Sequence, residues 1–376
     1  MKRIIIIEFV IFTVVWGQTP CTVSKTKQVG ECMFISNCPE VLKTFKESGE
    51  MPTICDRVLR TICCPLKTTT TSTTTTTTTH SPIRISVKKC KEYGQLVYEK
   101  KIVNSSIIGE PSVVKMISKC NHESVPLIVG GEDAKDGEFP HMALIGFGDG
   151  NRMEDYQCGG SMISEQWILS AAHCVSTGGL TANFAKVGNV VRGRDTLNSW
   201  TYKIIQRIPH PNYNSRFADD DIALFKLEKP AQLNVHVIPI CLPDKELLTT
   251  KSAIASGYGR TGFADDVSEK LMKVIIEYFK PADCNEAFAD NTKLSNNQIN
   301  WDKMVCAGSH NKTGDTCNGD SGGPLQIYHS DVYCMYKIIG ITSFGHAYCG
   351  FPGVPAIYTK VYHYLDWIES IVWPNQ

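Results

Sequence analysis

The stretch GDTCNGDSGGPL, residues 314–325, decides how this chain of 376 residues is interpreted. It places Ser321 between Asp320 and two glycines. A serine hydroxyl is a poor nucleophile until a base removes its proton, and glycines permit a tight turn whose N–H groups converge on one oxygen. An ordinary glycine-rich turn would have the same composition. The catalytic interpretation therefore requires a base and an orienting carboxylate elsewhere in the chain.

Two further stretches supply these groups. His173 follows strand-like residues in LSAAHC, and Asp221 directly precedes the apolar run in ADDDIALFKL. A lone histidine is usually a structural side chain, and consecutive aspartates usually form a solvated loop. The chain order histidine, aspartate, serine is, however, one of the known orders of a catalytic triad. We expect His173 to be the general base, Asp221 its orienting partner and Ser321 the nucleophile.

The composition indicates a globular, exported protein. Hydrophobic residues make up 42% of the chain, and 38 basic residues balance 38 acidic ones, so no global field favours nucleic acid or anionic membrane as a partner. Residues 1–17 place Lys2 and Arg3 before an apolar run that ends at Gly17, which is typical of a signal peptide. A buried N-terminal strand or helix is the alternative. We expect a secreted, extracellular protein without a membrane span.

The cysteines and the low-complexity stretch divide the rest of the chain. Sixteen cysteines, an even number without any Cys-x-x-Cys pair, favour disulfides in an oxidising compartment over zinc sites. Residues 21–64 form a cysteine-rich segment, and residues 65–127 a threonine-rich linker and tether. Asn104 and Asn311 begin sequons for N-glycosylation.

Residues 128–376 have the pattern of an all-β domain. Short β-rich runs such as WILSAAH, DIALFKL and YKIIGITSF alternate with turns that contain Gly, Pro, Asn and Asp. Near the end, apolar residues recur at helical spacing in VYHYLDWIESIVW, which predicts one C-terminal helix.

These motifs together resemble the chymotrypsin-like serine proteases. IVGG, CGGS, LSAAHC, DIAL, GDSGGP and SFG occur in that order between residues 128 and 376. The resemblance implies a double β-barrel with a C-terminal helix, and an oxyanion hole formed by the N–H groups of Gly319 and Ser321. It implies no cofactor and no metal. A calcium site is not indicated, because residues 186–204 lack an acidic pair.

The resemblance also implies a zymogen. In this family, cleavage before an Ile-Val-Gly-Gly sequence frees an α-ammonium that folds inward and pairs with the aspartate before the nucleophile. Here the cut would lie between Leu127 and Ile128, and the new ammonium would pair with Asp320.

Substrate specificity follows from the same resemblance. Asp315 would lie at the floor of the primary specificity pocket, with Gly345 and Gly353 on its walls. Glycines leave such a pocket open, and a carboxylate at its base requires a cationic partner. The resemblance therefore implies cleavage after Arg or Lys.

The N-terminal cysteines, which end in an adjacent pair, resemble the clip domain of arthropod serine proteases. Six cysteines allow fifteen pairings from sequence alone. The families imply the following pairs: Cys21–Cys63, Cys32–Cys55, Cys38–Cys64, Cys158–Cys174, Cys284–Cys306, Cys317–Cys349 and Cys120–Cys241. Cys90 and Cys334 remain, and we expect them to form a second bridge between the tether and the catalytic domain.

The architecture most resembles the snake-like group of clip-domain proteases. That resemblance implies a secreted endopeptidase of an immune cascade, of the Toll-signalling or melanisation type, in haemolymph or a similar fluid. Its partners would be an upstream protease that accepts leucine, a downstream protease zymogen and serpin inhibitors. A venom or developmental protease of the same architecture is an alternative, and so is a non-catalytic homologue that acts as an adaptor.

Overall fold

The computed structural model describes residues 20–23, 29–34, 38, 41, 44, 52–56, 61–65, 83–103, 113–120, 131–148, 156–192, 195–246, 250–260, 266–289, 291–295, 298–310, 319–345 and 352–374. The chain forms two compact units, Met1–His80 and Ser81–Gln376. The boundary follows the threonine-rich segment, whose polar side chains offer no apolar surface to a core.

The first unit contains a small antiparallel sheet, in the order β1-β2-β4-β3. Its strands are β1 (Pro20–Thr22), β2 (Val29–Phe34), β3 (Ile54–Asp56) and β4 (Thr61–Pro65). Two predicted disulfides bridge it, Cys21–Cys63 and Cys38–Cys64. Cys55 is also disulfide-bonded, whereas the side chain of Cys32 lies outside the described residues, so this predicted pair stays a prediction. Disulfides take the place of the large apolar core that so short a segment cannot form.

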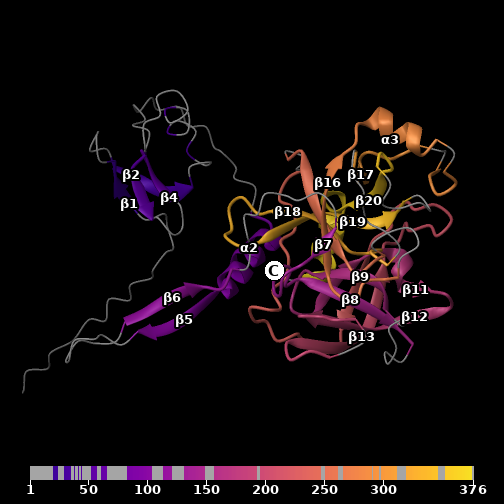
Figure 1. Ribbon diagram of the computed structural model, residues 1–376, viewed down its shortest axis with the longest axis horizontal. Helices are drawn as coiled ribbons and strands as arrows, with labels where there is room; N and C mark the ends of the chain where they lie inside the picture. The colour runs from indigo at the N-terminus through magenta and orange to yellow at the C-terminus, as the bar shows by residue number, and fades with distance from the viewer. Residues whose placement is uncertain are drawn as a thin grey trace, which may run out of the picture. The chain divides into compact units, whose positions relative to one another are not determined.

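The second unit begins its core with a barrel of six strands (Figure 1). The strands are β8 (Met142–Phe147), β9 (Tyr156–Met162), β10 (Trp167–Ser170), β12 (Leu180–Gly188), β13 (Ser199–Pro209) and β14 (Ala223–Leu227). A pairing between β12 and β8 closes the barrel, and the short β11 (Ser176–Thr177) extends β12 on its other side. Every residue of β8 and β10 is buried, which explains their unbroken apolar sequences MALIGF and WILS.

A second barrel of six strands lies beside the first, coloured orange to yellow in Figure 1. Its strands are β15 (Ser252–Gly257), β16 (Met272–Tyr278), β17 (Met304–Gly308), β18 (Pro324–Tyr328), β19 (Tyr336–Phe344) and β20 (Ala356–Lys360). A pairing between β15 and β16 closes this barrel, and β7 (Glu132–Asp133) adds to its edge. The helix α3 (Pro281–Ala287) starts with proline in its first turn, where no N–H is needed. The double barrel predicted from the sequence is therefore confirmed.

The predicted C-terminal helix is confirmed as well. A 3-10 turn, η6 (Val361–Tyr364), leads into α4 (Leu365–Val372). The buried residues Val361, Leu365, Ile368 and Val372 are those whose helical spacing predicted the helix. They belong to the same hydrophobic core as the residues of the first barrel, so the C-terminal helix packs against that barrel.

The segment before the catalytic domain also belongs to the second unit. The helix α2 (Ile85–Tyr93) and the 3-10 turn η2 (Gly94–Val97) bury Cys90, Tyr93 and Val97 against Ile238 and Met335. Much of the predicted tether is therefore packed onto the catalytic domain.

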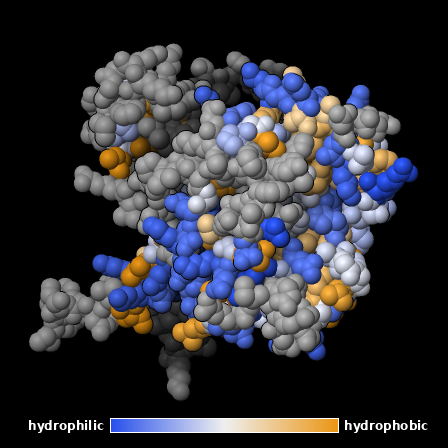
Figure 2. Space-filling view, turned by 45° about the vertical axis from the view of Figure 1, so that its right-hand side comes forward, coloured by the Kyte–Doolittle hydropathy of each residue, from blue (hydrophilic) through white to orange (hydrophobic). Residues whose placement is uncertain are grey.

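A hairpin follows this helix, formed by β5 (Tyr98–Val103) and β6 (Val113–Ser118). Ile102, Val114 and Met116 are each more than half exposed. Figure 2 shows the exposed apolar residues of one face as small groups separated by hydrophilic surface. Within the described part of the chain, no helix has the length and apolar character needed to cross a bilayer.

The two bridges between the tether and the catalytic domain differ from the prediction. The structure pairs Cys90 with Cys241, not with Cys334, at a Cα–Cα distance of 5.0 Å. It pairs Cys120 with Cys334, not with Cys241, at a Cα–Cα distance of 5.7 Å. Both expected pairs, Cys120–Cys241 and Cys90–Cys334, are therefore wrong.

The hairpin explains this exchange of partners. Packing of α2 on Met335 and Ile238 brings Cys90 to Cys241. The hairpin then returns the chain to its starting point, because its register places Ser118 opposite Tyr98. The ring of Tyr98 stacks on Tyr333 at 5.9 Å, so Cys120, two residues after Ser118, reaches the neighbouring Cys334.

A free thiol distinguishes the two pairings. In Cys90→Ser, we expect Cys241 to be the cysteine that reacts with iodoacetamide after the protein is unfolded without reductant, because its partner is missing. Peptide mass spectrometry locates the label. The matched variant Cys120→Ser should place the label on Cys334. Label on Cys334 in Cys90→Ser would instead support the pairing expected from the sequence.

Candidate active site

Each of the three predicted catalytic residues lies close to the end of a strand. His173 lies in η4 (Ala172–Val175), directly after β10, and Asp221 precedes β14. β10 and β14 pair antiparallel, with Ser170 opposite Ala223, so these two loops leave the first barrel side by side. Ser321 precedes β18 of the second barrel. The candidate site therefore joins the two barrels.

The contact between His173 and Asp221 is made twice. The Nδ1 atom of His173 lies 2.8 Å from Oδ2 of Asp221, and the His173 backbone N–H donates to Oδ1 at 2.9 Å. The side chain of Asp221 is 3% exposed and that of His173 is 32% exposed. With Nδ1 bonded to the carboxylate, Nε2 is the ring nitrogen left to exchange a proton with a substrate or nucleophile.

The electrostatics of this pair favour a charged imidazole. Burial alone would lower the pKa of His173, but the charge and hydrogen bond of Asp221 outweigh burial and raise it. Burial alone would raise the pKa of Asp221, but His173 and the surrounding donors outweigh burial and lower it. The buried carboxylate therefore stays ionised and stabilises an imidazolium formed during a reaction.

Two residues that the sequence analysis did not single out hold Asp221 in place. Ser343 of β19 donates its hydroxyl proton to Oδ2 of Asp221. Thr359 of β20 donates to the Asp221 backbone carbonyl at 2.8 Å. Both come from the second barrel, far away in the sequence. The SFG motif contains Ser343 and marked the family resemblance, but nothing in its spacing indicates this contact.

The structure also separates the three consecutive aspartates. Asp219 is partly exposed, and burial raises its pKa. Asp220 is buried and lies 2.9 Å from Nζ of Lys303, and the hydroxyl of Tyr364 donates to it at 3.0 Å. Only Asp221 contacts His173. The prediction that Asp221 faces the imidazole therefore agrees with the geometry, although Asp220 is a second buried carboxylate of the same run.

The turn that carries Ser321 is held from both sides. The N–H of Gly159, in β9, donates to the Ser321 carbonyl at 2.8 Å. The same carbonyl oxygen lies 3.7 Å from Sγ of Cys174, the residue after His173. The predicted disulfide Cys158–Cys174 joins the two flanking segments. Residue 321 is thus placed beside the histidine turn.

The backbone of this turn fits an oxyanion hole. The N–H groups of Gly322 and Gly323 donate to the carbonyls of Thr342 and Asp320, both at 2.8 Å. The N–H groups of Gly319 and Ser321 have no backbone acceptor among the described residues. Gly319 has φ of 102°, a conformation that favours glycine. These two N–H groups are those assigned to the oxyanion hole by resemblance.

Part of the predicted specificity pocket lies outside the described residues. This applies to Asp315 and to the pair Cys317–Cys349. Gly353 is described, with φ of 77°, and its N–H donates to the Ser309 carbonyl at 2.7 Å. Gly345 is exposed. The predicted disulfide Cys284–Cys306 is present nearby in the sequence.

Of the residues predicted to take part in activation, the structure describes only Asp320, the expected partner of the new N-terminus. Leu127 and Ile128 lie outside the described residues, as do the sequons at Asn104 and Asn311. Asp320 is described and is 8% exposed. Its Oδ1 accepts a hydrogen bond of 2.7 Å from the N–H of Gly259.

Cysteine side chains gather at three places in the described residues, two of which also contain a histidine, His329 or His173. The cysteines at each place are disulfide-bonded, and a disulfide sulfur is not the thiolate that metals bind. These groups therefore provide no metal site.

Comparison with known proteins agrees with the fold and the site. The family model described as Trypsin matches residues 128–368. Serine protease snk of Drosophila melanogaster is 32% identical over 359 residues, which cover 93% of this chain and 78% of that protein. Phenoloxidase-activating factor 3 of Holotrichia diomphalia is 35% identical over 271 residues, which cover 68% of this chain and 75% of that protein. Venom protease of Bombus pensylvanicus is 34% identical over 247 residues, which cover 64% of this chain and 96% of that protein.

The match and the geometry define a class: the chain belongs to the trypsin family and is a serine endopeptidase. The first unit contains a disulfide-bonded sheet, and the similarity to Serine protease snk extends along most of the chain. The protein is therefore a clip-domain serine protease of arthropod type, of the snake-like group.

The pair of buried aspartates offers a matched test. Asp221→Asn should lower kcat by about 10⁴, because the amide favours the wrong imidazole tautomer. Activity requires a neutral His173 and is lost as the pH falls through its pKa. Since the Asp221 charge raises that pKa, its removal should move the acid limb of kcat/KM to lower pH.

The control is Asp220→Asn, which removes the neighbouring buried carboxylate without touching His173. Its acid limb should coincide with that of the wild type, although its stability falls. The measurement is kcat/KM against pH for all three proteins. An unchanged acid limb in Asp221→Asn would contradict the assigned role.

Proposed function

We propose that this protein is a secreted zymogen, which cleavage between Leu127 and Ile128 converts into an endopeptidase that cuts after Arg or Lys. The observation that carries the proposal is the double contact between His173 and Asp221, at the junction of the barrels and beside the Ser321 turn. No metal or cofactor is needed for this chemistry.

In the proposed reaction, Nε2 of His173 removes the proton from Ser321 Oγ as that oxygen attacks the scissile carbonyl. The carbonyl oxygen becomes an oxyanion, which the N–H groups of Gly319 and Ser321 stabilise. His173 then gives its proton to the leaving amine, and the acyl-enzyme is hydrolysed by water through the same steps. Asp221 stays ionised and stabilises the imidazolium throughout.

Activation would complete this arrangement. The new α-ammonium of Ile128 would pair with the Asp320 carboxylate, directly before Ser321 in the chain. Support comes from the burial of Asp320, because a buried carboxylate gains strongly from a cationic partner. The pairing would orient the 319–321 backbone, which provides the oxyanion donors.

Asp315 would select the substrate. A carboxylate at the floor of the pocket, between Gly345 and Gly353, is left unpaired by an apolar side chain and paired by Arg or Lys. The family match supports this assignment, since cleavage after basic residues is typical of trypsin-like enzymes.

The biological setting is proposed from the relatives. One relative is named as a phenoloxidase-activating factor, and another, the protease snk, matches 93% of this chain. We place the protein in an extracellular immune cascade of the Toll-signalling or melanisation type, in haemolymph or a similar fluid. Its partners would be an upstream protease that accepts leucine, a downstream protease zymogen and serpin inhibitors.

A venom or developmental protease is the second candidate, favoured by the similarity to a bumblebee venom protease. That match covers 64% of this chain, whereas the match to snk covers 93%. A non-catalytic adaptor is disfavoured, because His173, Asp221 and Ser321 are all retained.

Removal of the nucleophile tests the reaction. Ser321→Ala should be secreted and folded, because alanine fits the turn, but its kcat on an Arg peptide should fall by on the order of 10⁶. A fluorophosphonate should label the cleaved wild type at Ser321 and leave this variant unlabelled. Labelling of the variant, or turnover within tenfold of the wild type, would contradict the assignment.

Leu127 makes the activation step testable. The enzyme with Asp315 in its pocket gains nothing from leucine, so the wild-type zymogen should not activate itself. Leu127→Arg should create a site for the active enzyme. A concentrated sample seeded with a trace of active enzyme should then convert at an accelerating rate, with a new N-terminus at Ile128.

The matched control is Leu127→Gln, which changes the same position without a positive charge and should stay intact under the same seeding. Conversion is followed by electrophoresis and N-terminal sequencing. If wild type or Leu127→Gln converts as fast as Leu127→Arg, the specificity or the activation site has been assigned wrongly.

A further inference from the structure

Arg192 is a buried arginine that the proposed reaction does not use. It follows β12 and is 2% exposed. Its guanidinium donates to three backbone carbonyls: Tyr156, Tyr258 at 2.7 Å and Ser268 at 3.2 Å. The backbone N–H of Arg192 donates to the Glu269 carbonyl at 2.8 Å. A charge buried this deeply is costly unless it is bonded and compensated, so its surroundings need an explanation.

One peptide bond connects Arg192 to Asp320. The carbonyl of Tyr258 accepts the hydrogen bond from Nη2 of Arg192. The N–H of Gly259, on the other side of the same planar peptide, donates to Oδ1 of Asp320 at 2.7 Å. A positive donor on the carbonyl polarises the peptide and makes its N–H a stronger donor to the carboxylate. The arginine therefore acts on Asp320 through a single rigid group.

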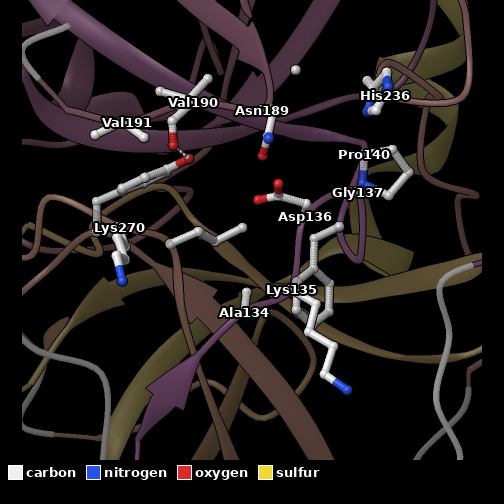
Figure 3. Close-up of a pocket in the computed structure, with 14 residues that line it drawn as sticks. Ala134, Lys135, Asp136, Gly137, Pro140, Asn189, Val190, Val191, His236 and Lys270 are labelled. Carbon is white, nitrogen blue, oxygen red and sulfur yellow. Dashed lines mark hydrogen bonds between the residues drawn. The ribbon is translucent and has the colours of Figure 1, made fainter. Parts of the chain in front are cut away.

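The peptide is itself held in place by the segment that carries Arg192. The hydroxyl of Tyr258 donates to the Val190 carbonyl at 3.2 Å, which is the dashed line at Val190 in Figure 3. The Tyr258 side chain is buried, so this bond does not compete with water. Two bonds from residues 190 and 192 thus fix the position of the Tyr258–Gly259 peptide.

The carboxylate fits against this peptide without space to spare. A Cβ atom added to Gly257 would lie 2.0 Å from Oδ1 of Asp320, and one added to Gly259 would lie 2.4 Å from Oδ2. Two residues without side chains therefore let the carboxylate approach the backbone closely. The electrostatics agree with this placement: burial lowers the pKa of Arg192, and the charge of Asp320 opposes that effect.

We propose that Arg192 is a positioning residue for the activation switch, which holds the ionised carboxylate of Asp320 against the Tyr258–Gly259 peptide, next to the nucleophile. This inference rests on the proposed function, in which Asp320 receives the new N-terminus. Arg192 balances the negative charge of Asp320 and fixes the position of its carboxylate. The adjoining backbone of residues 319–321 is thereby held in place. The residue touches no substrate and does not take part in the chemistry.

A double-mutant cycle tests the coupling of the two charges. All proteins carry Ser321→Ala, which removes self-digestion, and are studied as the uncleaved full chain. The corners are the parent, Arg192→Met, Asp320→Asn and the double variant. Urea unfolding is followed by tryptophan fluorescence, because Trp167, Trp200, Trp301, Trp367 and Trp373 all lie in the second unit.

We expect the two substitutions to be non-additive by on the order of tenfold in the unfolding equilibrium constant, with Arg192→Met costing less when residue 320 is already asparagine. If Arg192 only bonded its three carbonyls, Arg192→Met would cost the same in both backgrounds. The matched control is Arg207→Met, since Arg207 also donates to backbone carbonyls, those of Ala182 and Ile204. Its effect should add to that of Asp320→Asn.

Arg192→Lys keeps the test decisive if Arg192→Met does not fold. Lysine retains the charge without the three-carbonyl geometry, so Arg192→Lys should be more stable than Arg192→Met, and this advantage should shrink when Asp320→Asn is also present. Rescue of a non-folding Arg192→Met by Asp320→Asn would support the proposal. A methionine variant that Asp320→Asn does not rescue, or a lysine advantage that is equal in both backgrounds, would overturn it.

The cycle separates the inference from the proposed function, because it requires neither catalysis nor cleavage. Coupling without cleavage at Leu127 would leave the positioning role intact and count against the activation site. If the effects of the two substitutions on unfolding are additive and the wild-type zymogen is activated by cleavage after Leu127, the positioning role of Arg192 is rejected and the proposed function stands.

Discussion

The buried carboxylate of Asp221 is the constraint on which the rest of the candidate site depends. A negative charge with 3% of its side chain exposed must be compensated, and every group around it contributes to that. His173 supplies a ring and a backbone donor from the first barrel, while Ser343 supplies a hydroxyl from the second. Separation of the two barrels would therefore remove the Ser343 donor from this carboxylate. The carboxylate that orients the base thus also takes part in a contact between the two halves of the domain.

The sequence predicted what is encoded locally. Short β-rich runs predicted β10, β14 and β19, because strands inside a closed barrel bury nearly every side chain. Helical spacing predicted the C-terminal helix. The position of Asp221 directly before an apolar strand indicated which of the three consecutive aspartates contacts His173. These features require only neighbouring residues to be interpreted.

Contacts between distant segments could not be predicted in the same way. Ser343 and Thr359 reach Asp221 from strands more than a hundred residues further on, and no pattern in those strands indicates the partner. The tether cysteines were paired wrongly for a related reason. Which of them bonds to Cys241 depends on the hairpin that brings Ser118 back to the side of Tyr98, and the spacing of the cysteines does not indicate that pairing. No sequence pattern around Arg192 indicates that its guanidinium bonds the carbonyls of Tyr258 and Ser268.

The two bridges at Cys90 and Cys120 make the tether a closed covalent ring with the catalytic domain. Cleavage after residue 127 would create a new chain end but would release no fragment, since the N-terminal unit stays attached through both bridges. A partner bound to the disulfide-bonded sheet would therefore remain on the same covalently linked molecule as the protease after cleavage. Either bridge alone would hold the two chains together, so reduction of one disulfide would not release the N-terminal unit from the cleaved protease.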